Sequence, residues 1–272
     1  MSRFAKPIAV LLVILIFVAL FLFPLYILLR VAIGTPEETF SQRPPYLLHE
    51  ITFAHFKDLL ASGKTFFEPL GKSIITALLA SAASLLIAIP AAYGISKLDY
   101  RLRYILVIFI FVSRMVPEVS IALPIAISFI KFGLFDTIPG LVLAHLIRIL
   151  PVSCFILVGV FSNIPQELEK QARIDGASRM AALRKVVLPL SMGGIGVAGM
   201  FSFLLSWDEF IYASYLCLAR PTMPLKMFYY ISRGDIFSSA TYAAIITIPV
   251  LIVTFALQKY LKPDYLAGAI KG

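Results

Sequence analysis

Ionisable side chains lie inside the apolar stretches of this sequence, and they are the residues best placed to do chemistry. Arg114 and Glu118 lie four residues apart, so a continuous helix would place them on one face, where they can pair. His145 and Arg148 lie three residues apart in the next apolar stretch. If these stretches cross a membrane, such groups are energetically costly there and indicate a functional site.

A second group of residues combines carboxylates with aromatic rings. Asp208 and Glu209 follow Trp207, which is the only tryptophan, and Tyr212 lies three residues beyond Glu209. Carboxylates and guanidinium groups bind hydroxyl groups, while an aromatic face can stack on the C–H surface of a sugar. Two interpretations remain open: polar contacts that hold packed helices in register, or a water-filled path for a hydroxyl-rich solute. The second interpretation assigns the path to Arg114, Glu118, Trp207, Asp208, Glu209 and Tyr212.

The composition requires lipid to surround much of the chain. Of its 272 residues, 60% are hydrophobic and only 14% are charged, whereas about 25% of the residues in a soluble domain are charged. One globular core cannot bury such an excess of apolar surface. The net charge of +9 does not indicate a nucleic-acid partner, because the basic residues lie mainly in short loops between apolar runs. We find no catalytic motif and no cluster with metal-ligand spacing, so we expect no enzyme activity, metal or cofactor in this chain.

Six apolar runs are long enough to cross a bilayer, which requires about 20 residues. The sequence therefore predicts an all-α polytopic membrane protein. Lys and Arg are denser in the segments that precede the first run, join the second to the third and the fourth to the fifth, and end the chain, which predicts that both termini are cytoplasmic. The runs comprise residues 8–29, 73–96, 104–130, 138–161, 190–215 and 240–261.

We expect one transmembrane domain that covers residues 1–272. Its predicted parts are an N-terminal anchor helix with an outer loop (1–72), the core spans (73–261) and a cytoplasmic tail (262–272). The first run is read as an anchor because it is longer than the apolar core of a signal peptide, about 7–15 residues, and no small-residue cleavage site follows it.

The segment that joins the fourth and fifth runs, residues 163–189, is much longer than a hairpin between two helices requires. Glu167 and Glu169 lie in the first turn of a predicted helix, where the helix dipole favours acids. Asp175 and Gly176 mark its end, because glycine readily adopts the left-handed conformation of a helix terminus. A second helix with one apolar and one basic side follows. The pattern predicts a helix–turn–helix elbow at the cytoplasmic surface.

This elbow resembles the cytoplasmic loop of permease subunits from ABC importers. That loop reads Glu-Ala-Ala, three residues, Gly, nine residues, Ile, one residue, Leu-Pro. The spacing matches throughout, and only the first two positions of the pattern differ in residue class; the corresponding residues here are Lys170, Gln171, Ala172, Gly176, Val186, Leu188 and Pro189.

A wider resemblance points to the carbohydrate-uptake branch of these importers. Residues 164–177 are similar to the sequence IPxELEEAARIDGA found in the second permease of that branch. With further short stretches of similarity, the resemblance covers about residues 70–272. These stretches are residues 113–117, 132–137, 206–210 and 267–272.

The resemblance implies that the elbow is a coupling helix that docks into a cleft of a cytoplasmic ATPase. Lys170 replaces an acid that can pair with a basic residue of the ATPase. Either the ATPase compensates for this change, or the contact depends on shape and on the neighbouring Glu169. The tail residues Ala267, Gly268 and Lys271 are also implied to contact the ATPase dimer. The implied coupling residues are Glu167, Glu169, Lys170, Gln171, Ala172, Asp175, Gly176, Leu188 and Pro189.

The implied assembly contains a second homologous permease, two ATPase subunits that bind ATP and Mg, and an extracytoplasmic solute-binding protein. The resemblance implies that this assembly is located in the cytoplasmic (inner) membrane of a bacterium or archaeon, where the permease contacts lipid. The Gly-Lys-Ser triplet at residues 71–73 lacks the earlier glycine of a phosphate-binding loop, so energy must come from another polypeptide.

The implied solute is a mono- or oligosaccharide, and three alternatives remain. A related permease could carry a polyamine or a polyol phosphate, because importers for many solutes share the loop pattern. An ion-coupled secondary transporter would usually show internal repeats and paired broken helices, and we detect no clear repeat. A membrane enzyme would need a clustered acid–base or metal site near one surface.

Overall fold

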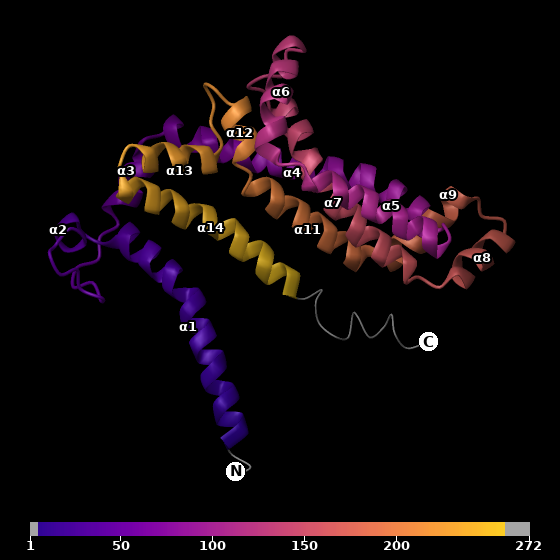
Figure 1. Cartoon of the computed structure of the whole chain (residues 1–272), viewed down its shortest axis with the longest axis horizontal. Coiled ribbons are helices and arrows are strands. Elements are labelled where there is room, and N and C mark those ends of the chain that lie inside the picture. Colours follow the sequence, from indigo (N-terminus) through magenta and orange to yellow (C-terminus); the bar gives the residue numbers. More distant parts are fainter. Residues whose placement is uncertain (1–4, 259–272) are drawn as a thin grey trace. The chain divides into compact units, whose positions relative to one another are not determined.

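The computed structural model describes the backbone of residues 5–258 and the side chains of residues 10–258 (Figure 1). Within the described residues the secondary structure is helical, apart from one isolated bridge between Gly34 and Ile51. The contact predicted for Ala267, Gly268 and Lys271 lies outside the described residues. The chain divides into two compact units.

The first unit consists of Met1–Phe67 and Lys226–Ile248. Its first helix is long and apolar, and the side chains of residues 10–27 are exposed within this chain. The loop region after that helix packs on Phe237, whose ring lies 5.6 Å from the ring of Phe40 and 4.5 Å from that of His55. The helices with residues in this unit are α1 (Ala5–Ile33), α2 (Pro36–Thr39), α3 (Ala54–Ala61), α4 (Lys64–Ser96), α13 (Met223–Ser232) and α14 (Ile236–Gln258).

The second unit consists of Glu68–Leu225 and Pro249–Gly272, and it contains every described residue of the predicted sites. α7 (Ile138–Ser162) lies at its centre and packs against α5, α11 and α12. The other elements that begin within this unit before α13 are α5 (Tyr100–Val112), η1 (Ser113–Met115), α6 (Glu118–Lys131), α8 (Gln166–Ile174), α9 (Arg179–Ala182), η2 (Leu183–Val187), α10 (Leu188–Leu190), α11 (Met192–Trp207) and α12 (Ile211–Leu216).

Small residues allow the helices of the second unit to approach closely. A Cβ atom on Gly194 of α11 would lie 2.3 Å from a methyl carbon of Val160 on α7, so glycine is required for this helix contact. The hydroxyl groups of Ser84, Ser153 and Ser202 form a buried chain with 2.8 Å links across α4, α7 and α11. Close packing of small residues and interhelical hydrogen bonds are the interactions that associate helices in lipid.

Four helical segments are long and apolar enough to cross a membrane: Val10–Ile33, Lys64–Ser96, Ile138–Ser162 and Ile236–Gln258. They correspond to the first, second, fourth and sixth predicted runs. The third run falls on a bent helix pair, Tyr100–Met115 with Glu118–Lys131, which bends by 82°. The fifth run covers Met192–Trp207, the second member of another bent pair whose first member is Arg179–Leu190 and whose bend is 78°, and it continues into α12. The chain thus has four to six candidate spans, depending on whether each bent pair is one span.

The bend in the third run separates two residues that the sequence placed together. Val116 and Pro117 are extended, with ψ angles of 122° and 123°, and proline has no N–H with which to continue the helical ladder. Arg114 and Glu118 therefore lie on different helices, and the prediction that they share one helical face was wrong. Glu118 instead lies near Arg148 of α7.

The fifth run is interrupted as well. α11 ends at Trp207, and α12 begins at Ile211 after a break that contains Asp208 and Glu209. Both carboxylates thus lie in a non-helical connection. Irregular backbone at membrane depth is tolerated where protein or a water-filled cavity surrounds it.

Candidate functional site

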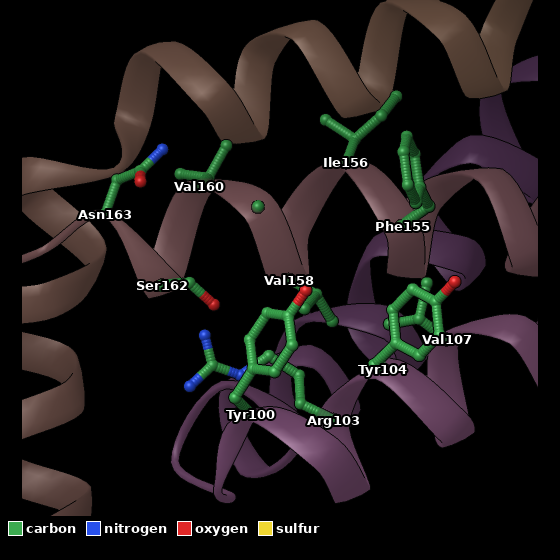
Figure 2. A pocket seen from close by; sticks show the side chains of 11 residues that line it. Tyr100, Arg103, Tyr104, Val107, Phe155, Ile156, Val158, Val160, Ser162 and Asn163 are labelled. Atoms are coloured by element: carbon green, nitrogen blue, oxygen red, sulfur yellow. The ribbon is translucent and has the colours of Figure 1, made fainter.

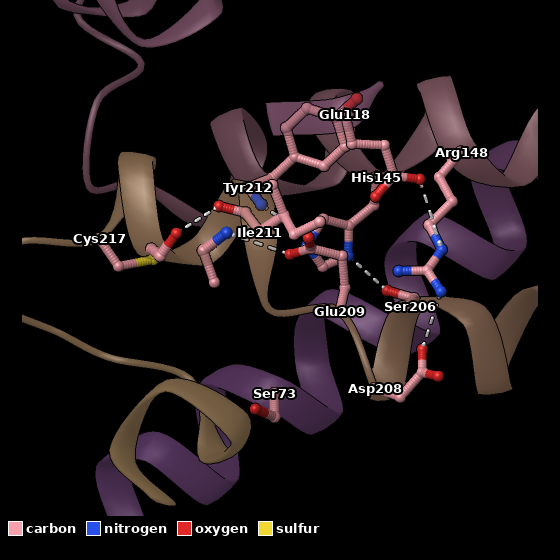
Figure 3. A network of polar contacts seen from close by, with 12 residues as sticks. Ser73, Glu118, His145, Arg148, Ser206, Asp208, Glu209, Ile211, Tyr212 and Cys217 are labelled. Carbon is pink, nitrogen blue, oxygen red and sulfur yellow. Dashed lines mark hydrogen bonds and ion pairs between the residues drawn. The ribbon is translucent and has the colours of Figure 1, made fainter. Parts of the chain in front are cut away.

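A buried polar network surrounds the break between α11 and α12 (Figure 3). Glu209 is 1% exposed, and its carboxylate accepts hydrogen bonds from the N–H groups of Tyr212 at 2.6 Å and Ala213 at 3.1 Å. The imidazole of His145, from α7, has Nε2 3.2 Å from the Glu209 carboxylate and Nδ1 2.7 Å from the Ser206 hydroxyl. These contacts satisfy the otherwise free N–H groups at the start of α12 and join that start to α7.

Arg148, one turn further along α7, lies between two carboxylates. Its Nε is 3.8 Å from Glu118 of α6, and its Nη2 is 3.7 Å from Asp208. Figure 3 shows the guanidinium group extending between these two acids. Both distances exceed those of a direct charge-assisted hydrogen bond, about 2.7–2.9 Å. We call Arg148, Glu118 and Asp208 the Arg148 cluster.

The Arg148 cluster is partly open to solvent, in contrast to the Glu209 network. The side chains of Arg148, Glu118 and Asp208 are 20%, 24% and 59% exposed. Arg114 and Tyr212 line a small cavity together with Glu118 and Arg148. The cluster therefore offers donors and acceptors that a polar solute could reach.

The six residues predicted for the path thus divide into two groups. Arg114, Glu118 and Asp208 lie in or beside the Arg148 cluster, whereas Glu209 belongs to the buried network. Trp207 is 1% exposed and stacks on Phe203 with the ring centroids 5.9 Å apart. Tyr212 is fully buried. The predicted path does not include Arg148, although it is an intramembrane charge, because sequence spacing does not show which helices face each other.

The predicted helix–turn–helix is present between α7 and α11. Asp175 ends α8, and Gly176 follows with a φ of +91°, a conformation that a residue with a side chain rarely adopts. The hydroxyl of Ser178 accepts the N–H of Ala181 at 3.2 Å and thereby caps α9. The chain then continues through η2 and α10, and Leu183 and Val187 are buried against α4 and α7.

The two faces of α8 differ. Glu167, Lys170 and Gln171 are exposed to solvent, while Glu169 and Ala172 are less exposed. The hydroxyl of Tyr93 donates to the Glu169 carboxylate at 2.5 Å, and the ammonium group of Lys97 forms an ion pair with it. Tyr93 lies near the end of α4 and Lys97 just after it. No sequence signal connects these residues, because 76 positions separate Tyr93 from Glu169.

The electrostatic surroundings keep Glu169 ionised. Burial by itself would raise its pKa, but the hydrogen bonds from Lys97 and Tyr93 and the charges of Lys97 and Arg173 outweigh burial, so the pKa lies below its usual value. The carboxylate lies in a cleft of about 450 Å³ that is otherwise mainly basic. The charged residues lining this cleft are Lys97, Glu169, Lys170, Arg173 and Arg179.

An apolar groove of similar size, about 460 Å³, lies between α5 and α7 (Figure 2). Tyr100, Arg103 and Tyr104 line it from α5, and residues including Phe155 and Ile156 line it from α7. Arg103 is the only charged residue along the groove. None of the residues predicted for the path lines it, so it is not the candidate site.

The sequence matches the family described as binding-protein-dependent transport system inner membrane component over residues 84–266, more than half of the chain. The chain belongs to this family. It is therefore an inner-membrane, multi-pass permease subunit of a binding-protein-dependent ABC importer, a non-catalytic transport component. The permease assignment made from the elbow is confirmed.

Individual relatives are similar in sequence to most of the permease. The trehalose transport system permease protein SugB of Mycobacterium tuberculosis is 28% identical over 228 residues, which cover 82% of this chain and 83% of the relative. The sulfoquinovosyl glycerol transport system permease protein SmoH of Agrobacterium fabrum is 30% identical over 259 residues, which cover 92% and 89% of the two chains.

The fold is that of a known importer. One chain of a bacterial ABC transporter that imports the acidic polysaccharide alginate superposes with a TM-score of 0.77 at 21% identity, covering 96% of this permease and 99% of that chain. This likeness extends the agreement from sequence to the arrangement of the helices.

Proposed function

We propose that this permease carries a sugar, either a mono- or an oligosaccharide, and that the Arg148 cluster forms part of its path. The relatives named above are permeases for trehalose and sulfoquinovosyl glycerol, both of which contain a sugar. The observation that carries the proposal is the 3.7–3.8 Å spacing of Arg148 from its two acids. A hydroxyl group both donates and accepts hydrogen bonds, so sugar hydroxyls can bridge the carboxylates and the guanidinium group.

The proposed assembly follows the family pattern. A second homologous permease completes the path, a binding protein delivers the solute, and two ATPase subunits bind ATP and Mg. In this proposal the pair Tyr100–Met115 with Glu118–Lys131 counts as one span, and α11 with α12 counts as another, so the chain crosses the membrane six times with both termini in the cytoplasm. The distribution of Lys and Arg supports that orientation.

The elbow is the proposed coupling element. α8 and the turn at Gly176 would dock on the cytoplasmic ATPase through Glu167, Lys170 and Gln171. The exposure of these three side chains to solvent supports this role. Asp175 and Gly176 would set the direction of the turn, and Leu188 and Pro189 would return the chain to the membrane. Contact of the tail residues Ala267, Gly268 and Lys271 with the ATPase dimer is proposed from the family resemblance.

Purification of the detergent-solubilised assembly through this permease tests the proposal. We expect a second permease and an ATPase to co-purify, and mass spectrometry of the associated binding protein to identify a saccharide. Recovery of a polyamine or a phosphate ester would overturn the choice of solute. Failure to recover any ATPase from an otherwise intact preparation would overturn the proposed coupling.

Arg148→Met tests the path separately. We expect uptake of the solute recovered from the binding protein to fall by roughly tenfold or more, since hydrogen bonds to charged groups contribute about 1.5–3 kcal/mol. Lys131→Met is the matched control, because Lys131 is an exposed basic residue at the end of α6. Uptake by Arg148→Met at the level of the control would contradict a role of Arg148 in the path.

A further inference from the structure

Glu169 of α8 points away from the surface through which the proposed coupling helix would meet an ATPase. Its side chain is only 12% exposed. One carboxylate oxygen accepts the hydroxyl of Tyr93 at 2.5 Å, and the other forms the ion pair with Lys97. The Lys97 ammonium also lies 5.1 Å from the centre of the Tyr93 ring. The three side chains therefore form a closed set of mutual contacts, which we call the Glu169 link.

The Glu169 link matters because α8 has few other attachments. All nine residues of α8 are described, and none of them is buried. Its packing within the chain is mainly with α9 and η2, the elements that follow it in the elbow. By contrast, Leu183 and Val187 of η2 are buried beside Ala88 and Ala92 of α4. The second half of the elbow is thus anchored by apolar packing, and the first half reaches α4 through polar contacts.

We propose that Glu169 is a positioning residue that transmits movement of α8 directly to the end of α4. This inference rests on the proposed coupling function of the elbow and deepens it. A charged hydrogen-bonded contact resists separation more strongly than a neutral one. A displacement of α8 by the ATPase would therefore pull on Lys97 and Tyr93 and so on the membrane helix that ends there.

The geometry separates this role from direct contact with the ATPase. The exposed neighbour Lys170 presents its charge to solvent. Both carboxylate oxygens of Glu169 already have partners within its own chain, so its role in the link requires no contact with the ATPase. Of the two alternatives for Lys170, the link inside the permease favours compensation by the ATPase over a contact made by Glu169.

The first experiment compares Glu169→Gln and Lys97→Gln with wild type in the complete importer, reconstituted with its binding protein as purified with its native solute. We expect both variants to keep the ATPase through purification, while stimulation of ATP hydrolysis by the binding protein falls roughly fivefold or more. Arg101→Gln is the matched control: Arg101 is an exposed basic residue that follows Lys97 closely. Its stimulation should equal that of wild type.

The second experiment exchanges the charges. Glu169→Lys and Lys97→Glu should each uncouple the importer, and the double variant should regain stimulation, because the pair is restored with reversed polarity. A purely structural defect would not be repaired in this way. Double-variant recovery isolates the interaction between the two side chains from their separate effects.

Three results overturn the proposal. They are normal stimulation in Glu169→Gln, absence of recovery in the charge exchange, and loss of the ATPase from Glu169→Gln during purification, which would mean that Glu169 contacts the ATPase. Failure of the proposed function has a different signature. In that case the wild-type permease itself would retain no ATPase, whatever residue stands at position 169.

Discussion

The imidazole of His145 lies 3.2 Å from the carboxylate of Glu209, and both side chains are at most 2% exposed. The same carboxylate accepts two backbone N–H groups at the start of α12. A break in a membrane helix exposes such N–H groups, and each one left unsatisfied in an apolar environment destabilises the fold. Glu209 therefore makes the interruption between α11 and α12 possible, while His145 fixes the direction of the carboxylate.

Glu209→Ala should destabilise the permease by about 1–3 kcal/mol for each of the two backbone N–H groups that it leaves without an acceptor. Glu209→Gln should lose less stability than Glu209→Ala, since the amide oxygen can still accept a hydrogen bond from one of these N–H groups. Thermal unfolding of the detergent-solubilised protein, followed by tryptophan fluorescence, measures the difference. Asp208→Ala is the control, because Asp208 is 59% exposed. Equal losses for the alanine variants at 208 and 209 would refute this account of Glu209.

A second buried charge holds the loop that follows α12. Lys72 is 5% exposed, and its ammonium group lies 3.1 Å from a carboxylate oxygen of Asp136, 3.4 Å from the sulfur of Cys217 and 2.5 Å from the carbonyl oxygen of Arg220. Asp136 also accepts the N–H of Ala219 at 3.0 Å. Lys72 thereby connects α4, the turn before α7 and the loop at residues 217–222.

Lys72→Met should destabilise this region by about 1.5–3 kcal/mol, the contribution of hydrogen bonds to a charged group. The effect should be local, so hydrogen exchange of the amides at residues 218–222 should accelerate more than exchange in α7. Lys131→Met removes an exposed lysine and should change neither measurement. Uniform acceleration across the whole chain would show that Lys72 supports the entire fold instead of this loop.

The helices were predictable where one local signal determines them. The run at 138–161 matches α7 to within one residue, because length and apolarity are sufficient for a helix in lipid. The run at 73–96 ends with α4, but that helix begins earlier, at Lys64, in a segment that was assigned to the outer loop. The end of α8 was equally clear from Asp175 and Gly176. Contacts between residues that lie far apart in the sequence could not be predicted. Lys72 looked like part of a failed phosphate-binding motif, and its partners are 64 to 148 residues away.

The broken spans show the same limit. Pro117 is visible in the sequence, but proline can either kink a helix or end it, and only tertiary packing decides which. The bend of 82° moved Glu118 from the helical face of Arg114 to Arg148 on α7. Likewise, the sequence shows that Glu169 lies in the first turn of α8, but not that Tyr93 and Lys97 end a membrane helix beside it.

Glu169 should make the stability of the folded permease decrease as the pH falls. Its pKa is lower in the folded protein than in the unfolded chain, so the carboxylate stabilises the fold above the unfolded pKa of about 4.3, and this contribution disappears as the pH falls through the folded pKa. The difference in melting temperature between wild type and Glu169→Gln should therefore be constant from pH 7 to about 5 and shrink below that. A difference that grows on acidification would contradict the lowered pKa.

The turn after α8 offers a test of whether its backbone conformation serves coupling or only stability. Gly176 has a φ of +91°, and Gly234, which follows α13 in the other unit, has a φ of +75°; an added Cβ would meet no atom within 4 Å at either position. Valine at either site must adopt a strained conformation or shift the turn, at a cost of about 1–3 kcal/mol. We therefore expect Gly176→Val and Gly234→Val to lower the melting temperature by similar amounts.

The two glycine variants should differ in function. Gly176→Val redirects the chain between α8 and α9, so stimulation of ATP hydrolysis by the loaded binding protein should be lost, while membrane insertion remains normal. Gly234→Val should retain that stimulation, because its turn is remote in sequence from the elbow. Stimulation is measured in proteoliposomes, and insertion by the detergent-extractable yield of each variant. If both variants keep normal stimulation, the direction of the turn at Gly176 has no part in coupling, and the docking surface must lie elsewhere on the permease.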